Sequence, residues 1–142
     1  MRYLLDTNVI SETQRPRPNQ RVLDWLAQVD NERLYLSVVT LAEIRVGIEL
    51  LPHGARRERL RTWVEEELPS RFEGRLLDVS ADVAHAWGRI VARTQRAGSA
   101  MEAVDGLLAA TAETHQLTLV TRNVNDFEQL GISLFNPWAD SG

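Results

Sequence analysis

Residues 2–8 read Arg2-Tyr3-Leu4-Leu5-Asp6-Thr7-Asn8, and this stretch decides how the rest of the chain is interpreted. The apolar run up to Leu5 predicts a short buried strand, and the polar triplet after it supplies the turn chemistry that ends the strand. Asp6 is therefore expected at the carboxyl end of a strand. In an open parallel sheet, ligand sites gather beyond that end of the strands.

The alternation of short apolar runs with amphipathic stretches continues along the chain. Helical spacing of apolar residues separates the runs, and Pro52, Pro69 and Gly98 mark expected helix ends. Further strands are expected at residues 34–38, 75–79, 117–121 and 132–135. Strands that alternate with helices predict an α/β fold, a three-layer α/β/α sandwich with a mostly parallel central sheet. We expect a single domain over residues 1–142.

Three further acidic residues stand where a predicted strand ends or a predicted helix begins. Thr40-Leu41-Ala42-Glu43 matches a capping box, which places Glu43 in the first turn of a helix. Asp105 lies near the start of an Ala-rich helix expected over residues 102–115, and Asn123 is expected to cap a short helix with Asp126. Each acid alone has a structural explanation as a turn or cap residue. Their shared placement at one end of the sheet predicts a joint site.

Clustered carboxylates of this kind suit a hard divalent cation. Mg²⁺ prefers carboxylate and water oxygens, so two to four acids from separate elements can hold one ion and leave positions open for phosphate. Without the ion the carboxylates repel one another, and at least one favours its protonated form. We therefore expect metal binding and stability to be coupled.

Composition narrows the classes of function. The net charge of -4 argues against indiscriminate electrostatic binding to nucleic acid or anionic membranes, although local patches can still bind phosphate. The absence of cysteine excludes thiolate metal sites and cysteine nucleophiles, and it is compatible with a reducing cytoplasm. Because no apolar stretch approaches the length that spans a bilayer, we expect a soluble, cytoplasmic protein with no membrane partner.

All 16 basic side chains are arginines, and two groups of them bear on phosphate binding. The densest group, Arg56 to Arg61, could guide RNA, but three glutamates follow on the same helix, and Arg61 with Glu65 has ion-pair spacing. A solvated helix face is the favoured interpretation there. Arg15 and Arg17 follow the Asp6 segment and could reach phosphate, although their alternation with proline equally describes a semi-rigid connector.

Four segments together resemble a known family in their order and relative spacing over nearly the whole chain. They are Leu4-Leu5-Asp6-Thr7-Asn8-Val9-Ile10-Ser11, Leu41-Ala42-Glu43-Ile44-Arg45-Val46-Gly47, Asp105-Gly106-Leu107-Leu108-Ala109-Ala110-Thr111-Ala112 and Thr121-Arg122-Asn123-Val124-Asn125-Asp126-Phe127. They closely resemble PIN-domain ribonucleases of the VapC toxin type.

This resemblance implies a role for each acid. Asp6 and Asp105 match the principal metal-binding acids, and Glu43 matches the second acidic position, so these three form the expected metal site. Asn123 or Asp126 fills a variable fourth region, and the expected catalytic set is Asp6, Glu43, Asp105 and Asp126.

Other positions support or depart from the family pattern. Thr7 and Thr121 would orient carboxylates through their hydroxyl groups. Glu102 stands where many relatives have proline before the Asp105 helix, and Asn123 stands where some have a direct acidic ligand. The fourth ligand is therefore the one that the resemblance does not assign.

The implied function is Mg²⁺-dependent hydrolysis of RNA phosphodiester bonds, with Mn²⁺ as a possible substitute. The resemblance also implies the toxin role in a type II toxin–antitoxin pair, a homodimer, and a cognate antitoxin that blocks the acidic cleft with a basic side chain.

Two alternatives from other classes are retained. A Mg²⁺-dependent phosphatase with an aspartyl intermediate would also place Asp6 after the first strand, but Asp6-Thr7-Asn8 lacks the second aspartate that commonly serves as acid and base there. The other is a noncatalytic dimeric regulatory module whose acids only cap helices. Retention of all three main acids argues against it.

Overall fold

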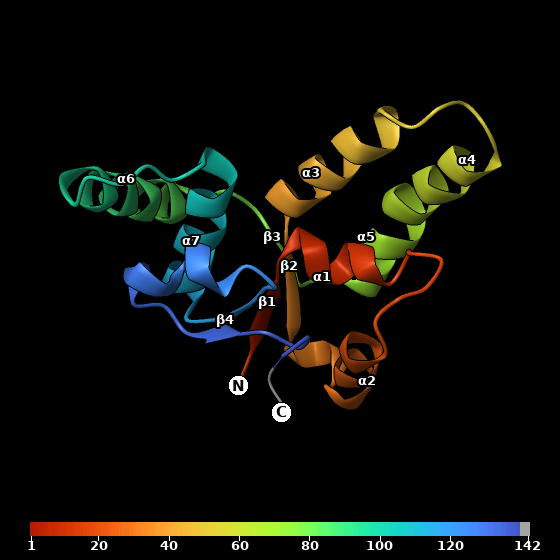
Figure 1. Cartoon of the computed structure of the whole chain (residues 1–142), viewed down its shortest axis with the longest axis horizontal. Coiled ribbons are helices and arrows are strands. Elements are labelled where there is room, and N and C mark those ends of the chain that lie inside the picture. The colour runs from red at the N-terminus through yellow and green to blue at the C-terminus, as the bar shows by residue number, and fades with distance from the viewer. Residues whose placement is uncertain (140–142) are drawn as a thin grey trace.

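The computed structural model describes residues 1–139 and has a parallel sheet at its centre (Figure 1). Its strand order is β3-β2-β1-β4-β5, and each neighbouring pair is parallel. The central strand β1 pairs Leu4 with Tyr35 of β2 and with Leu119 of β4. The strands are β1 (Tyr3–Leu5), β2 (Leu34–Ser37), β3 (Leu76–Leu77), β4 (Thr118–Val120) and β5 (Leu134–Phe135). The prediction of a mostly parallel sheet is confirmed.

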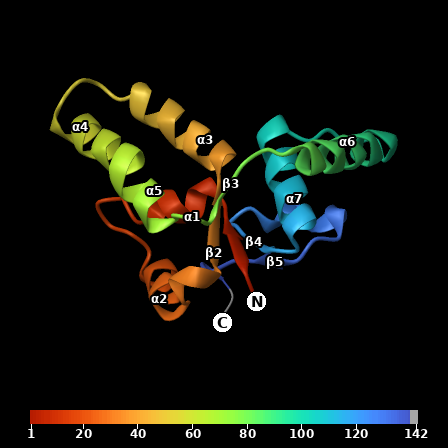
Figure 2. The ribbon, with the colours of Figure 1, turned by 180° about the vertical axis from the view of Figure 1, so that it is seen from behind.

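Helices pack on both faces of this sheet (Figures 1 and 2). Successive strand side chains point to opposite faces, so Leu5 and Val120 pack into one core while Leu4 and Leu119 pack into the other. The first core lies under α1 (Thr7–Glu12), α2 (Gln20–Gln28), α3 (Val38–Glu49), α4 (Ala55–Thr62) and α5 (Leu68–Arg71), and the second under α6 (Ala81–Arg96) and α7 (Ala103–His115). The three-layer prediction is confirmed.

The segment after β1, which was predicted to be a turn, is a helix instead. Helix α1 begins immediately at Thr7, and the Asp6 side chain caps it by accepting a hydrogen bond from the Thr7 amide at 2.7 Å. An aspartate directly before a helix satisfies an amide that has no partner within the helix. Strand and helix therefore meet at Asp6 without a loop, and this junction fixes the position of its carboxylate.

The capping box predicted at Thr40 and Glu43 is also wrong. Helix α3 begins three residues earlier, at Val38, and its cap is Ser37, whose hydroxyl accepts a hydrogen bond from the Val39 amide at 3.0 Å. The last residue of β2 is thus the cap of α3. Glu43 therefore lies in the second turn, where it is free of any capping duty.

Two smaller expectations are corrected in the middle of the chain. Pro69 does not end the third predicted helix, because α5 follows directly on a π-helical turn, η2 (Trp63–Glu67), and the proline falls in the first turn of α5. Proline is tolerated there because early helical amides need no partner within the helix. The strand expected over 75–79 is reduced to Leu76–Leu77.

Three short 3₁₀ helices complete the described elements: η1 (Asn31–Arg33), η3 (Val124–Asp126) and η4 (Glu128–Leu130). None of the helices in residues 1–139 has both the length and the apolar character needed to cross a membrane.

Candidate functional site

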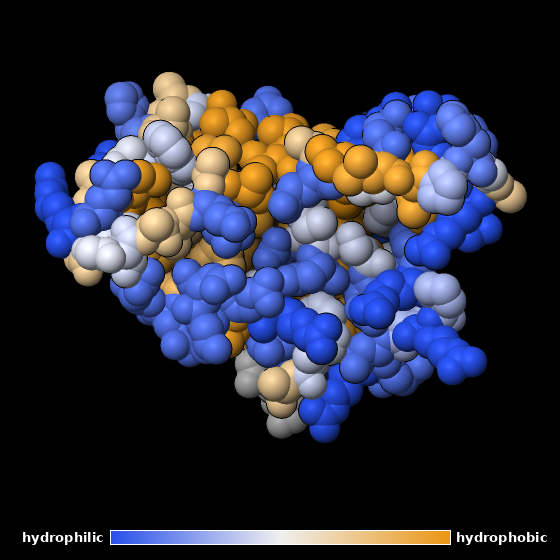
Figure 3. Space-filling model, turned by 45° about the horizontal axis from the view of Figure 1, so that its top comes forward, coloured by the Kyte–Doolittle hydropathy of each residue, from blue (hydrophilic) through white to orange (hydrophobic). Residues whose placement is uncertain are grey.

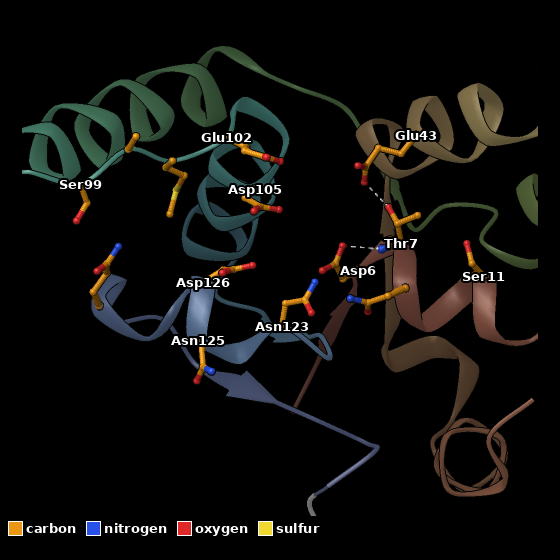
Figure 4. A pocket seen from close by; sticks show the side chains of 14 residues that line it. Asp6, Thr7, Ser11, Glu43, Ser99, Glu102, Asp105, Asn123, Asn125 and Asp126 are labelled. Atoms are coloured by element: carbon orange, nitrogen blue, oxygen red, sulfur yellow. Dashed lines mark hydrogen bonds between the residues drawn. The ribbon is translucent and has the colours of Figure 1, made fainter. Parts of the chain in front are cut away.

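An acidic cleft of about 690 Å³ lies at the carboxyl end of β1, between the α1–α3 side and the α7 side of the molecule (Figure 4). All four predicted acids line it, although they come from parts of the chain up to 120 residues apart, which is the separation of Asp6 and Asp126. Within the described residues, none of the side chains that line it is basic. They are Asp6, Thr7, Asn8, Ser11, Glu43, Ser99, Ala100, Met101, Glu102, Asp105, Asn123, Asn125, Asp126 and Gln129.

Asp6 is the most firmly held of the acids. It is only 6% exposed, and its two carboxylate oxygens have different donors: the Thr7 amide at 2.7 Å and the Thr121 hydroxyl at 2.8 Å. Burial raises the pKa of Asp6, the two hydrogen bonds lower it, and the charges of Glu43 and Asp126 raise it again. The pKa is raised overall, so an adjacent positive charge would stabilise the ionised form.

Thr121 ties the end of β4 to this carboxylate. Its hydroxyl is fully buried, donates to Asp6, and accepts a hydrogen bond from the Asn123 amide at 3.0 Å. The Asn8 side-chain amide lies 3.5 Å from the same oxygen. The adjacent parallel strands β1 and β4 thus end in one hydrogen-bonded unit, and the expectation that Thr121 orients a carboxylate matches this geometry.

Glu43 faces the cleft from α3, on the side opposite Asp105 (Figure 4). The Thr7 hydroxyl donates a hydrogen bond of 2.5 Å to its carboxylate, so Thr7 contacts one acid through its amide and a second through its side chain. Thr7 therefore sets the spacing of Asp6 and Glu43. Since Glu43 does not cap a helix, this is the only hydrogen bond of its side chain within the described residues.

Asp105 approaches the cleft from the first turn of α7. Its pKa rises from 3.8 to about 6, first because of burial and then because of the charges on the neighbouring acids, with Asp6 and Asp126 ahead of Glu102 and Glu43. Even the favourable helix N-terminus leaves this carboxyl among uncompensated negative charges. A cation placed among these acids would favour their ionised forms.

The fourth position contains both of its candidates. Asp126 lies in η3 and Asn123 immediately precedes it, and both line the cleft (Figure 4). Asn123 does not cap η3 through its side chain as expected; its backbone oxygen accepts from the Asp126 amide at 3.1 Å instead. Only Asp126 adds charge, and it acts on the pKa of both Asp6 and Asp105.

Sequence reasoning missed several residues of the cleft. Glu102 is a fifth carboxylate in the cleft. It precedes Asp105 by three residues at the start of α7, and this i,i+3 spacing, which places both side chains on the same side of a helix, could have predicted its presence. Asn8 and Ser11 also line the cleft, and they lie about one helical turn apart on α1. The first residue of that helix, Thr7, contacts both Asp6 and Glu43. These neutral polar side chains form part of the wall that α1 contributes to the cleft.

The donor chemistry of the cleft fits a hard divalent cation. Carboxylate, hydroxyl and amide oxygens are ligands that Mg²⁺ accepts, and a divalent cation would offset part of the charge of the five carboxylates. In residues 1–139, however, no three acidic or histidine side chains stand close enough together to hold one ion between them. Mg²⁺ usually keeps several waters and binds through one or two carboxylates. The arrangement therefore fits a hydrated ion between facing acids.

Comparison with protein-family models matches residues 3–132 to the PIN domain. Among curated proteins, toxin FitB of Neisseria gonorrhoeae is 42% identical over 96% of this chain and 99% of its own length. The VapC ribonuclease Y4jK of Sinorhizobium fredii is 36% identical over 95% of this chain and 96% of its own length.

Solved structures give the same family likeness. The crystal structure of FitAcB from Neisseria gonorrhoeae superposes with a TM-score of 0.91 at 40% identity, covering 97% of this chain and 99% of that one. VapBC-5 from Mycobacterium tuberculosis, described as a member of the VapBC family of toxin–antitoxin systems, gives a TM-score of 0.65 at 25% identity, with 94% of both chains covered.

Proposed function

The chain belongs to the PIN-domain family, and on that premise we propose that it is a metal-dependent endoribonuclease that acts as the toxin of a toxin–antitoxin pair. The observation that carries this proposal is the cleft itself: five carboxylates face one open space that no basic side chain among residues 1–139 lines. An RNA phosphate could not approach these charges without a cation. Hydrolysis of RNA phosphodiester bonds is the function that this chemistry supports best, and we propose that it takes place in the cytoplasm.

Asp6 and Asp105 are the residues that would hold the cation, with Glu43 and Asp126 completing or tuning its surroundings. When bound, Mg²⁺ or Mn²⁺ supplies activation of water and neutralisation of charge that develops on phosphate oxygens. The contribution of the protein is to hold the carboxylates of Asp6 and Glu43 in place. Thr121 and Thr7 hold Asp6, and the Thr7 hydroxyl holds Glu43, so the two carboxylates need little reorganisation when substrate arrives.

The test compares the purified chain, free of any partner, with three variants on labelled RNAs in Mg²⁺, Mn²⁺ or chelator. Asp6→Asn and Glu43→Gln should lower cleavage at least about 100-fold while the protein stays folded. Glu113→Gln is the matched control, because this exposed residue lies on α7 outside the cleft. Equal cleavage by wild type, Asp6→Asn and Glu43→Gln, or cleavage that persists in chelator, would refute the proposal.

We also infer a cognate antitoxin that inserts a basic side chain into the cleft. The excess of carboxylates is complementary to such a group, and the similar solved structures include FitAcB and a member of the VapBC family of toxin–antitoxin systems. Because the acids would then pair with the guanidinium or ammonium group, the antitoxin and the cation should compete. Addition of excess Mn²⁺ to a purified complex should weaken it. Affinity that is independent of Mn²⁺ would count against insertion into the cleft.

A homodimer is supported by an apolar ridge on α3. Val46 and Leu50 are 60% and 80% exposed, and with Ala42 they recur every fourth residue along one side of the helix. Figure 3 shows apolar side chains gathered over this helix at the upper rim. We propose that a second copy covers the ridge. Val46→Asp should convert the dimer into a monomer in sedimentation, and an unchanged dimer would exclude this ridge as the interface.

No specific observation supports either alternative, the aspartyl phosphatase or the noncatalytic module. Both carboxylate oxygens of Asp6 accept hydrogen bonds from the protein, which suits a positioned ligand better than the nucleophile of an aspartyl phosphatase. A purely structural module would not explain Glu43, which faces the cleft without a capping role.

A further inference from the structure

A second groove, of about 360 Å³, adjoins the acidic cleft and differs from it in chemistry. Thr7, Ser11 and Glu43 line both, so the two spaces lie next to each other. The groove lies between α1, α3 and the α4–η2 segment, and its remaining wall is largely apolar. Figure 1 shows α1, α3 and α4 near one another on the same side of the sheet. The other lining residues are Gln14, Arg15, Ile44, Gly47, Ile48, Leu51, Arg56, Leu60 and Trp63.

Gly47 forms an open place in this wall. It lies inside α3, where glycine is unfavourable relative to alanine. Internal packing does not require it, because a Cβ built there would meet no neighbouring atom within 4 Å. The missing side chain leaves the helix surface flat and accessible to an occupant. Since Gly47 follows Glu43 by four residues, it lies about 6 Å farther along the helix from the reaction cleft.

The groove also supplies the positive charge that the cleft lacks. Arg15 and Arg56 line it, and Arg15 pairs with the buried Glu12 at 3.4 Å. The Arg56 side chain is exposed, and it makes neither a hydrogen bond nor an ion pair with any other residue of the described chain. A planar guanidinium without a partner is well suited to a phosphate. One edge of the groove is polar, with hydroxyl groups from Thr7 and Ser11 and the amide of Gln14.

We propose that this groove receives the nucleobase of the nucleotide next to the scissile phosphate, while Arg56 contacts a phosphate of the same strand. The inference rests on the proposed ribonuclease function. The flat surface at Gly47 and the aliphatic side chains of α3 accommodate a ring face, and the polar edge meets the hydrogen-bonding edge of the base. The shared boundary with the cleft and the two arginines that line the groove favour RNA over an apolar peptide as the occupant.

The test fills the groove without disturbing the fold. Gly47→Leu projects a side chain into the open space, and Gly88→Leu is the matched control, because Gly88 is also an α-helical glycine with open space above it, on α6. Gly47→Leu should lower kcat/KM for RNA cleavage at least about tenfold and change which nucleotide flanks the cut. Gly88→Leu should change neither. Thermal unfolding of both variants confirms that they are folded.

A substrate modification provides the second arm. Removal of the base beside the mapped cut should slow wild type, whereas Gly47→Leu should lose little more, because the pocket is already blocked. Arg56→Ala should raise KM and reduce its salt dependence, with the neighbouring Arg59→Ala, outside the groove, as control. Active wild type with unchanged kinetics and cut-site preference in Gly47→Leu would overturn the inference and leave the groove to a protein partner. Wild type that cleaves no RNA would instead refute the ribonuclease function.

Discussion

Removal of the Asp105 charge should stabilise the metal-free protein at neutral pH. The carboxyl of Asp105 has a pKa of about 6 in the folded protein, against 3.8 ordinarily, because it is buried among other acids. An ionised Asp105 is therefore more costly in the folded state than in the unfolded chain. Asp105→Asn removes that cost while it keeps the size of the side chain.

The size and pH dependence of the effect follow from the two pKa values. At about 1.4 kcal/mol for each pKa unit, the difference corresponds to at most about 3 kcal/mol, and solvent screening of this partly exposed group lowers it to about 1 to 2 kcal/mol. Folding raises this pKa, so the penalty is absent below pH 3.8 and complete above about pH 6. By pH 4.5, roughly a third of it is present.

Urea unfolding in chelator, at pH 4.5 and pH 7.5, measures this difference. Asp105→Asn should gain about 1 kcal/mol or more at pH 7.5 and clearly less at pH 4.5. Asp82→Asn is the matched control, since Asp82 occupies the first turn of α6 outside the cleft. It should lose a few tenths of a kcal/mol through the helix dipole. A destabilised Asp105→Asn at pH 7.5, or the same gain at both pH values, would refute the reasoning.

Substitutions at three further positions test how the acids are held and how the residues around them pack. Thr121→Val removes the buried hydroxyl that donates to Asp6, so urea unfolding should show a loss of about 1 to 3 kcal/mol, and Thr121→Ser should retain most of the stability. Ser37→Ala should cost about 1 kcal/mol, also in urea, because it removes the cap of α3; a change within error would revive the capping box. Gly106→Ala should lower Tm despite the better helix propensity of alanine, since its Cβ would lie 3.0 Å from Nε1 of Trp87, whereas an unchanged or higher Tm would show that Trp87 moves freely.

The sheet and the set of acids could be predicted from the sequence because both depend on local signals. Short apolar runs and the residues that interrupt them locate strand ends, and parallel strands bring those ends together at one edge. Asp6 and Asp105 were placed correctly at a strand end and a helix start. Such patterns indicate where a side chain lies on its own element.

Contacts between elements could not be obtained in this way. The Thr7 hydroxyl that holds Glu43, and the Thr121 hydroxyl that holds Asp6, join residues 36 and 115 positions apart. Local matching also misassigned Glu43, since Thr40 and Glu43 have capping-box spacing but Ser37 lies closer to the strand end and caps first. The expected strand at 75–79 was shortened because its pairing with β2 extends over only two residues.

The most direct test of the central claim is the rate of RNA cleavage by the partner-free chain as Mn²⁺ is titrated into chelator-treated protein. If the facing acids hold the cation, wild type should be inactive without metal and recover in a saturable way, whereas Asp105→Asn should need much more Mn²⁺ and reach a lower maximal rate. A wild-type rate that does not depend on Mn²⁺, or an identical titration curve for Asp105→Asn, would contradict the claim.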